Sequence, residues 1–194
     1  MSQDALKKII SLSSDVTEIV NNFLSDMTIS YFQYDKCNQN HQRIILTSRP
    51  EWLLHCIDNA YYKISYFESK LSGYSSKIQL WKHVNKISAP IFNAAENHFN
   101  MHNGISLISR QGENTEYYHF AFSKINVQEE MSVADWVNNL HKFINYFKKS
   151  AEALLVKSTK NLFVYPDESV FDAGFNGVVN KDENTAVPLF LKKF

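Results

Sequence analysis

Strand-forming segments come in neighbouring pairs along this chain, and that order constrains the fold more than any other feature. The first pair is 29–34 and 43–47, both rich in β-branched and aromatic residues, around a polar turn at 35–40. The second pair is 105–109 and 117–122. Each pair predicts an antiparallel β-hairpin, because two such runs are separated only by polar turn material.

Helical patterns flank and separate the hairpins. Apolar residues recur at three and four from Ser2 to Asp26, as one kinked helix or two short ones, and a long helix is predicted from Ser132 to about Lys157. Prolines mark two further helix starts, at Pro50 and after Ser88. A short strand is expected at Lys77–Trp81. The order predicts an α/β fold of the α+β kind, an α-β-α sandwich with an antiparallel five-stranded, PAS-like or GAF-like sheet between helical layers.

Breaks in these patterns suggest the domain limits. The second hairpin is expected to turn over Arg110–Glu116, and Gly104 to end the preceding helix as a left-handed cap. Residues 67–77 are predicted to form a loop or lid of the kind that borders a ligand pocket. We therefore expect one domain over residues 1–160, followed at 161–194 by a linker or docking tail.

Composition excludes several functional classes. Twenty Lys and Arg balance twenty Asp and Glu, which argues against nucleic-acid binding by the whole chain. The 14 Phe, 10 Tyr and 3 Trp favour a densely packed domain or an aromatic-lined cavity. The two cysteines make no disulfide framework, and there is no signal peptide or membrane-spanning run, so a cytoplasmic protein is expected.

Catalytic and metal-binding patterns are weak. The sequence contains no glycine-rich phosphate loop, nucleophile elbow or zinc-protease motif. His98 and His102 stand at i, i+4, but with no third ligand nearby two solvated histidines are favoured over a metal site. Cys56 follows His55, yet adjacent helical residues point about 100° apart, so a cysteine-dependent enzyme is only a third hypothesis. The Lys148–Lys149 pair is interpreted as a solvated helix face. We predict no catalytic residues, no metal and no cofactor.

Four short motifs carry a family resemblance. They are Leu46-Thr-Ser-Arg-Pro-Glu-Trp52, Tyr61-Tyr-Lys-Ile-Ser-Tyr66, Trp81, and Phe99-Asn-Met-His-Asn-Gly104-Ile-Ser-Leu. In this order and spacing the chain resembles the autoinducer-binding domain of LuxR-type quorum-sensing transcription regulators. The resemblance covers about residues 3 to 160 in element order.

The resemblance implies roles for particular residues. Trp52 matches the tryptophan whose indole N–H bonds the lactone carbonyl of an acyl-homoserine lactone. Tyr61 matches a later aromatic of the same segment, and Trp81 matches, within one residue, the aromatic that packs against the signal's head group. Gly104 matches the glycine that opens the following strand.

Two positions depart from the family pattern. Cys56 stands where the family has a tyrosine, and Ser65-Tyr66 stands where it has Asp-Pro, whose aspartate accepts the ligand's amide N–H. A serine hydroxyl lacks the charge that makes such hydrogen bonds about twice as strong. We therefore predict a ligand-binding set of Trp52, Cys56, Tyr61, Ser65 and Trp81 for another small amphipathic signal molecule, or a pocket that Tyr66 and other side chains fill.

Three functional hypotheses follow. The first is the small-molecule-sensing and homodimerising domain of a LuxR-type regulator with an altered ligand preference. In that family DNA is bound only through a helix-turn-helix domain, whose sequence pattern is absent from this chain. Dimerisation is expected through the long helix, Trp136 to Leu155. The second is a ligand-independent interaction module of the same fold, and the third is the cysteine-dependent enzyme.

Overall fold

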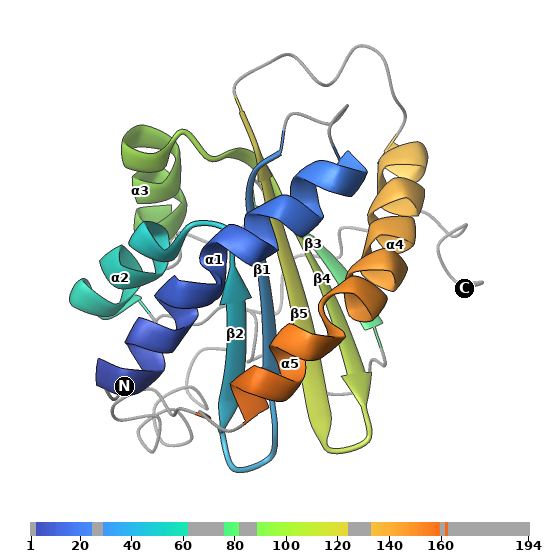
Figure 1. The fold of residues 1–194 in the computed structure, drawn as a ribbon. Helices are drawn as coiled ribbons and strands as arrows, with labels where there is room; N and C mark the ends of the chain where they lie inside the picture. The colour runs from blue at the N-terminus through green and yellow to red at the C-terminus, as the bar shows by residue number, and fades with distance from the viewer. Residues whose placement is uncertain are drawn as a thin grey trace, which may run out of the picture.

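Five antiparallel strands form the centre of the structure, with helices on either side (Figure 1). The computed structural model describes residues 3–24, 29–61, 76–81, 89–123, 133–159 and 162. The elements are α1 (Gln3–Leu24), β1 (Ile29–Cys37), β2 (Arg43–Thr47), α2 (Pro50–Asp58), β3 (Ser76–Leu80), α3 (Ala89–Phe99), β4 (His102–Gln111), β5 (Asn114–Phe122), α4 (Val133–Ser150) and α5 (Glu152–Thr159). The strand order is β2-β1-β5-β4-β3, so β1 and β5 join the two hairpins at the centre. The predicted element order and five-stranded antiparallel sheet are confirmed.

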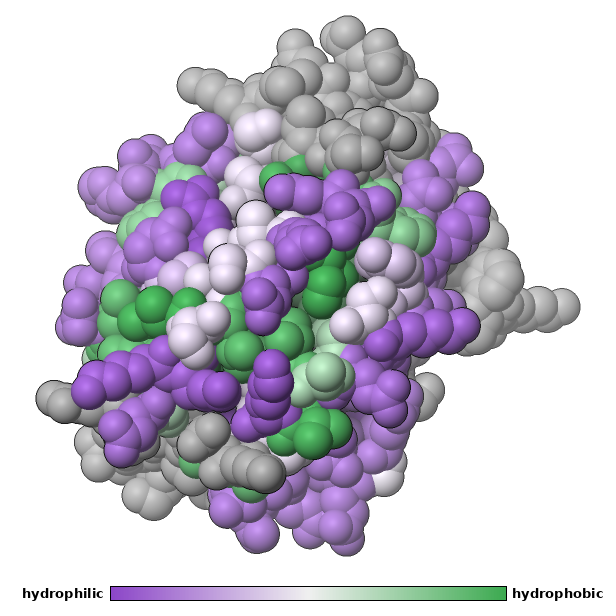
Figure 2. Space-filling model, viewed as in Figure 1, coloured by the Kyte–Doolittle hydropathy of each residue, from purple (hydrophilic) through white to green (hydrophobic). Residues whose placement is uncertain are grey.

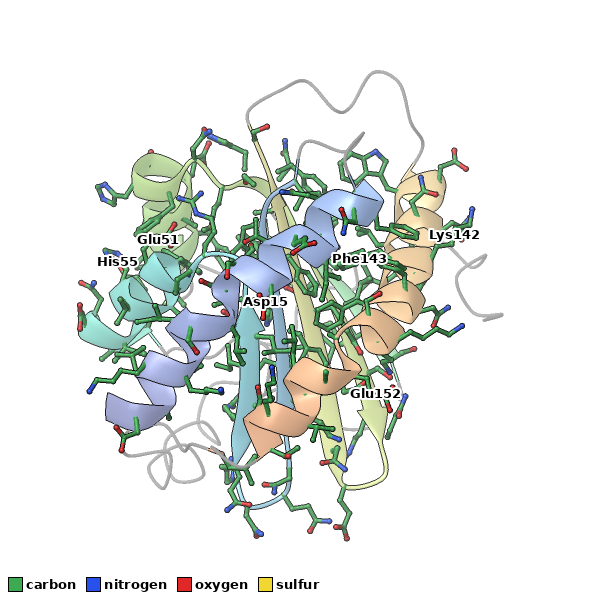
Figure 3. The ribbon with its side chains drawn as sticks, in the orientation of Figure 1. Asp15, Glu51, His55, Lys142, Phe143 and Glu152 are labelled. Atoms are coloured by element: carbon green, nitrogen blue, oxygen red, sulfur yellow. The ribbon has the colours of Figure 1, made fainter. Side chains whose placement is uncertain are left out.

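One face of the sheet is apolar and packs against α1, α4 and α5. Phe32 of β1 lies opposite Phe120 of β5, and both rings contact Phe143 of α4, at centroid distances of 5.0 and 5.7 Å. Phe147, one helical turn later, adds a 4.8 Å edge contact with Phe32. Figure 3 shows Phe143 directed from α4 toward the strands while Lys142 points away. Because this aromatic cluster is fully buried, it supplies the main hydrophobic core.

The opposite face of the sheet is covered by α2 and α3. Tyr31, Trp81 and Ala121 of this face form a cluster with Trp52 of α2 and the α3 residues Ala94 and Ala95. In Figure 1, α2 and α3 stand beside each other and apart from α4 and α5. The sheet therefore separates two cores of different character.

A buried carboxylate fastens α4 to the sheet. Glu116 of β5 accepts hydrogen bonds from the hydroxyls of Tyr34 and Tyr118, both at 2.9 Å, and an ion pair from Lys148 at 2.7 Å. Although burial alone raises a carboxyl pKa, the hydrogen bonds and the Lys148 charge hold the pKa of Glu116 below its usual value. Lys148 is thus an ion-pair partner, and its interpretation as part of a solvated face was wrong.

Several strand boundaries differ from the sequence prediction. β1 continues through Asp35 to Cys37, so the predicted turn at 35–40 is wrong, and the chain turns over residues 38–42 instead. The second hairpin is longer than predicted, because β4 and β5 pair up to Gln111 and Asn114 around Gly112, whose φ is 59°. The alternation of side chains continues through these polar residues, and cross-strand pairing outweighs their turn preference.

The helices also need correction. The first helix is continuous over Gln3–Leu24, while the long C-terminal helix is divided at Ala151 into α4 and α5. Helix α3 ends at Phe99 with Asn100 at φ 54°, so Gly104 is not its left-handed cap. Gly104 lies inside β4 instead.

Several predictions fall outside the described residues. These are Ser88 and Ser132, at which two of the predicted helices begin, Ser65 and Tyr66, nearly all of the 67–77 loop and, apart from Leu162, the 161–194 tail. Among the described helices, none is both long and apolar enough to cross a membrane. The outward faces of α1, α4 and α5 are mainly hydrophilic, with small separated apolar areas (Figure 2).

Replacing Glu116 with Gln tests the polar connection between α4 and the sheet. The amide keeps the shape but loses the charge that pairs with Lys148, so Glu116→Gln should destabilise the domain by about 1–3 kcal/mol. Urea unfolding followed by circular dichroism measures this. Glu152→Gln, the same exchange at an exposed position on α5 (Figure 3), is the control and should stay close to wild type. Equal stability of the two variants would refute the role of Glu116.

Candidate ligand-binding site

Helix α2 places Trp52 against the second face of the sheet. Pro50 occupies the first turn, where its missing N–H costs no hydrogen bond. Arg49, just before it, donates to the Phe99 carbonyl at 3.0 Å and so ties the start of α2 to the end of α3. The Trp52 ring is 5% exposed and lies between His55, stacked at 5.7 Å, and Phe99, edge-on at 5.0 Å. Its position is fixed by both helices.

Four of the five predicted ligand-binding residues belong to one cluster. Trp52 and Trp81 are buried in it, and Cys56 and Tyr61 pack against it half-buried. The fifth, Ser65, lies outside the described residues. Burial raises the pKa of the Cys56 thiol to about 12, which keeps it protonated and does not fit a nucleophilic cysteine.

Trp81 is positioned by a glycine and a serine. A Cβ atom at position 104 would overlap the Trp81 indole ring, so only glycine lets the ring lie flat on β4. The indole N–H donates to Ser106 Oγ at 2.9 Å, and Ser106 Oγ lies 2.7 Å from His119 Nδ1. Tyr31 lies beside the ring, with centroids 6.1 Å apart.

The two tryptophans differ in how their N–H groups are used. The Trp81 N–H is occupied by Ser106. For Trp52, no hydrogen bond from the indole N–H to a described residue is seen, and this N–H is not among the fully buried polar atoms that lack a partner. Of the two indole N–H groups, the one of Trp81 therefore has a partner among the described residues and the one of Trp52 does not.

His119 is a neutral buried base. The Ser106 hydroxyl is fully buried and, within the described part of the chain, has only His119 Nδ1 to donate to, which leaves the ring proton on Nε2. Burial, with a smaller contribution from the Arg43 charge, lowers the pKa of His119 from 6.5 to about 3. His119 thus stays uncharged across the physiological pH range.

Sequence reasoning missed the buried polar residues of this face. Strand alternation places them on the same side as Tyr31 and Trp81; they are Gln33, Asp35, Arg43, Thr47, Gln79, Ser106 and His119. The signal in the sequence was the alternation Tyr31, Gln33, Asp35 along β1, which the predicted turn at 35–40 concealed. Extending the strand by three residues would have revealed it.

The two histidines at i, i+4 lie on different elements. His98 lies on α3 but His102 lies on β4, so their sequence spacing does not place them on one helix face. His102 contacts Glu96 at 3.0 Å and Asn100 at 2.8 Å. Both histidines line an open hollow of about 530 Å³ near Arg49. Among the described residues no group of three or more potential ligands is suited to a metal ion.

The fold is an α/β domain in which helices flank both sides of one five-stranded antiparallel sheet. No protein-family model and no curated protein matches the sequence. Solved structures do: the chain has the fold of LuxR-type autoinducer-binding domains. The SdiA complex with octanoyl-rac-glycerol gives a TM-score of 0.55 at 11% identity, over 73% of this chain and 60% of that one.

Two further solved structures give similar values. Escherichia coli SdiA gives a TM-score of 0.56 at 14% identity, over 80% of this chain and 65% of that one. CepR2 from Burkholderia cenocepacia, described as an N-acylhomoserine lactone dependent LuxR family transcription factor, gives 0.52 at 15% identity, over 81% and 98%. The chain thus spans about three-fifths of the SdiA chains. The resemblance seen in the sequence is confirmed at the level of the fold.

Replacing Gly104 with Ala tests the packing of Trp81. The added methyl must displace the indole, which should destabilise the domain by about 1–3 kcal/mol and change the tryptophan fluorescence. Gly112→Asn is the control, because its turn position is open and Asn tolerates positive φ. Urea unfolding monitored by fluorescence measures both. A Gly104→Ala protein with wild-type stability and emission would contradict the close approach.

The low pKa of His119 predicts a pH-dependent stability. Between about 3 and 6.5 the unfolded chain binds a proton at this residue and the folded chain does not. Stability is therefore complete above pH 6.5 and falls as the pH drops, by up to about 1.4 kcal/mol per pH unit from this group. Glu116 adds a further loss of stability only below the pKa of an unperturbed glutamate, because its own pKa is lowered in the folded protein. The free energy of unfolding of wild type and His119→Gln should converge as the pH falls from 7 to 5; parallel curves would contradict a neutral buried His119.

Proposed function

We propose that this chain is the ligand-sensing domain of a LuxR-type transcription regulator. The observation that carries the proposal is the convergence of Trp52, Cys56, Tyr61 and Trp81 in one cluster on the sheet face opposite α4. Their sequence order suggested the family before the fold was known, and the fold agrees with it. Ser65 completes the proposed site. The ligand lies between the second sheet face and helices α2 and α3.

The proposed ligand is a small amphipathic molecule. One similar structure is described as dependent on N-acylhomoserine lactone, and another contains octanoyl-rac-glycerol, so both names describe an acyl chain on a polar head. For this chain, the Trp52 N–H is the proposed donor to a carbonyl of the head group. Tyr61 and the flat Trp81 ring provide the apolar walls around it.

The mechanism follows from linkage. A ligand that binds only the folded domain stabilises it, by about 2.7 kcal/mol at a concentration one hundred times its Kd. Ligand binding then raises the amount of folded, dimerisation-competent protein. The apolar stripe of α4, including Trp136, Leu140 and Phe143, is buried against the chain's own sheet. The proposed homodimer therefore uses outward-facing side chains rather than this buried stripe.

Replacing Trp52 with Phe tests this function. The substitution keeps an aromatic ring but removes the N–H donor, so affinity for N-octanoyl-homoserine lactone should fall roughly tenfold. Thermal shift and isothermal titration with purified protein measure the loss. Trp136→Phe is the matched control on α4, where the ring packs on Phe122 in the other core. Trp136→Phe should retain the wild-type Kd.

Two outcomes would contradict the proposal. If no acyl-homoserine lactone or acyl-glycerol stabilises the wild-type protein, the chain is not a sensor of this ligand class. If ligands bind equally to wild type and Trp52→Phe, the head group does not contact Trp52. One feature supports the alternative hypothesis of a ligand-independent module: the Trp81 N–H already donates to Ser106 within the protein. A wild-type protein that none of these compounds stabilises would favour this alternative.

A further inference from the structure

The second sheet face carries a charged and hydrogen-bonding strip that an apolar ligand site does not need. We use "polar band" for Asp35 of β1, Arg43 of β2, His119 of β5 and Ser106 of β4. These four strands are neighbours in the sheet, and all four residues are at most 9% exposed. They point to the same side of the sheet as Tyr31 and Trp81. The polar band is therefore continuous with the proposed ligand-binding face.

The ion pair in the polar band uses only half of its carboxylate. Arg43 Nη1 contacts Asp35 Oδ2 at 2.8 Å, with side-chain exposures of 4% and 7%. Asp35 Oδ1 is buried and accepts no hydrogen bond from the described part of the chain. Burial raises the pKa of the Asp35 carboxyl, and the Arg43 charge opposes this rise. A carboxylate oxygen buried without a donor is costly, so the site is incomplete as it stands.

Stability alone does not account for such a pair. Replacing a buried ion pair by apolar side chains of similar volume is often neutral or stabilising, because desolvation offsets the attraction between the charges. The neighbouring residues of this face, Ile45 and Tyr31, show that apolar side chains fit here. A role in recognising a bound group explains both the charge and the vacant Oδ1 acceptor.

The distance between Tyr31 and Asp35 along β1 indicates the length of the proposed ligand. Tyr31 lies at the Trp52–Trp81 end of the face, and Asp35 lies four residues further along the same strand. At about 3.3 Å per residue, the two positions are roughly 13 Å apart. An extended decanoyl chain covers this distance. A ligand with its head group at Trp52 therefore brings the far end of its chain to Asp35.

We propose that the ligand carries a neutral hydrogen-bond donor, such as a hydroxyl, at the end of its chain remote from the head group, and that Asp35 Oδ1 accepts this hydrogen bond. The inference rests on the proposed function and specifies its ligand class. A neutral donor fits better than an ammonium group, because Arg43 already places a positive charge beside the carboxylate. A plain alkyl end would cover Asp35 Oδ1 without satisfying it.

Two matched probes test the proposal on the full chain. They are decanoyl-homoserine lactone and ω-hydroxydecanoyl-homoserine lactone, which differ only in the terminal hydroxyl. The hydroxylated probe should bind the wild-type protein roughly tenfold to a hundredfold more tightly, as measured by isothermal titration. Equal binding of the two probes overturns the inference and leaves the sensing function intact. Binding of neither probe, to wild type or variants, overturns both.

A double variant tests whether the preference for the hydroxylated probe depends on Asp35 and Arg43. Asp35→Leu with Arg43→Met removes both charges together, so neither is left buried without its partner. This protein should lose the preference and bind the plain decanoyl probe at least as tightly as the hydroxylated one. Asp15→Leu with Lys142→Met likewise replaces one acidic and one basic side chain by apolar ones, at exposed positions on α1 and α4 (Figure 3), and should keep the wild-type preference. A preference that survives in the Asp35 and Arg43 variant overturns the inference; if that variant does not fold, the wild-type comparison decides.

Discussion

Antiparallel pairing of β1 with β5 joins two hairpins that lie far apart in the chain, and the remaining elements are arranged around this contact. Because side chains alternate along both strands, the pairing that places Phe32 opposite Phe120 also places Gln33 opposite His119 on the other side. The register of this one strand pair thus determines which side chains lie on each face of the sheet. A shift by one residue would exchange the aromatic core with the polar side chains, so the packing of α4 also selects the register that places the polar side chains on the α2 side.

The two faces are stabilised by different physical means. Large apolar rings dominate the α4 face, and its buried carboxylate, Glu116, has three donors. On the α2 side, burial of polar groups is only partly compensated, as the single contact of Asp35 and the linked Ser106 and His119 show. The three donors to Glu116 and the missing donor to Asp35 Oδ1 among the described residues are the contrast that supports the proposed recognition of a ligand on the second side.

The sequence predicted the parts of this structure that depend on local pattern. Paired strand segments gave the five-stranded sheet, and proline with Trp52 gave the start and inward face of α2. Features that depend on distant partners were not predictable. Asp35 has turn propensity and becomes part of a strand only through pairing with β2 and β5. Gly104 appeared to be a helix cap because its actual function, contact with the Trp81 ring, involves a residue far away in sequence.

The same distinction applies to the candidate site. The aromatic residues were identifiable because their characteristic order of Trp and Tyr can be read directly from the sequence. In the fold these residues lie in one cluster, as the family resemblance implied. The residues that would set specificity were not identifiable, because Asp35, Arg43 and His119 come from three strands and become neighbours only in the folded sheet. In the proposed site, the aromatic cluster would accept many amphipathic molecules, since ring contacts discriminate weakly between apolar chains. A buried acceptor discriminates strongly, because an analogue without the matching donor leaves it unpaired. If this domain selects one ligand among similar acyl compounds, the selection therefore depends on the polar band more than on the aromatic residues that reveal its family resemblance.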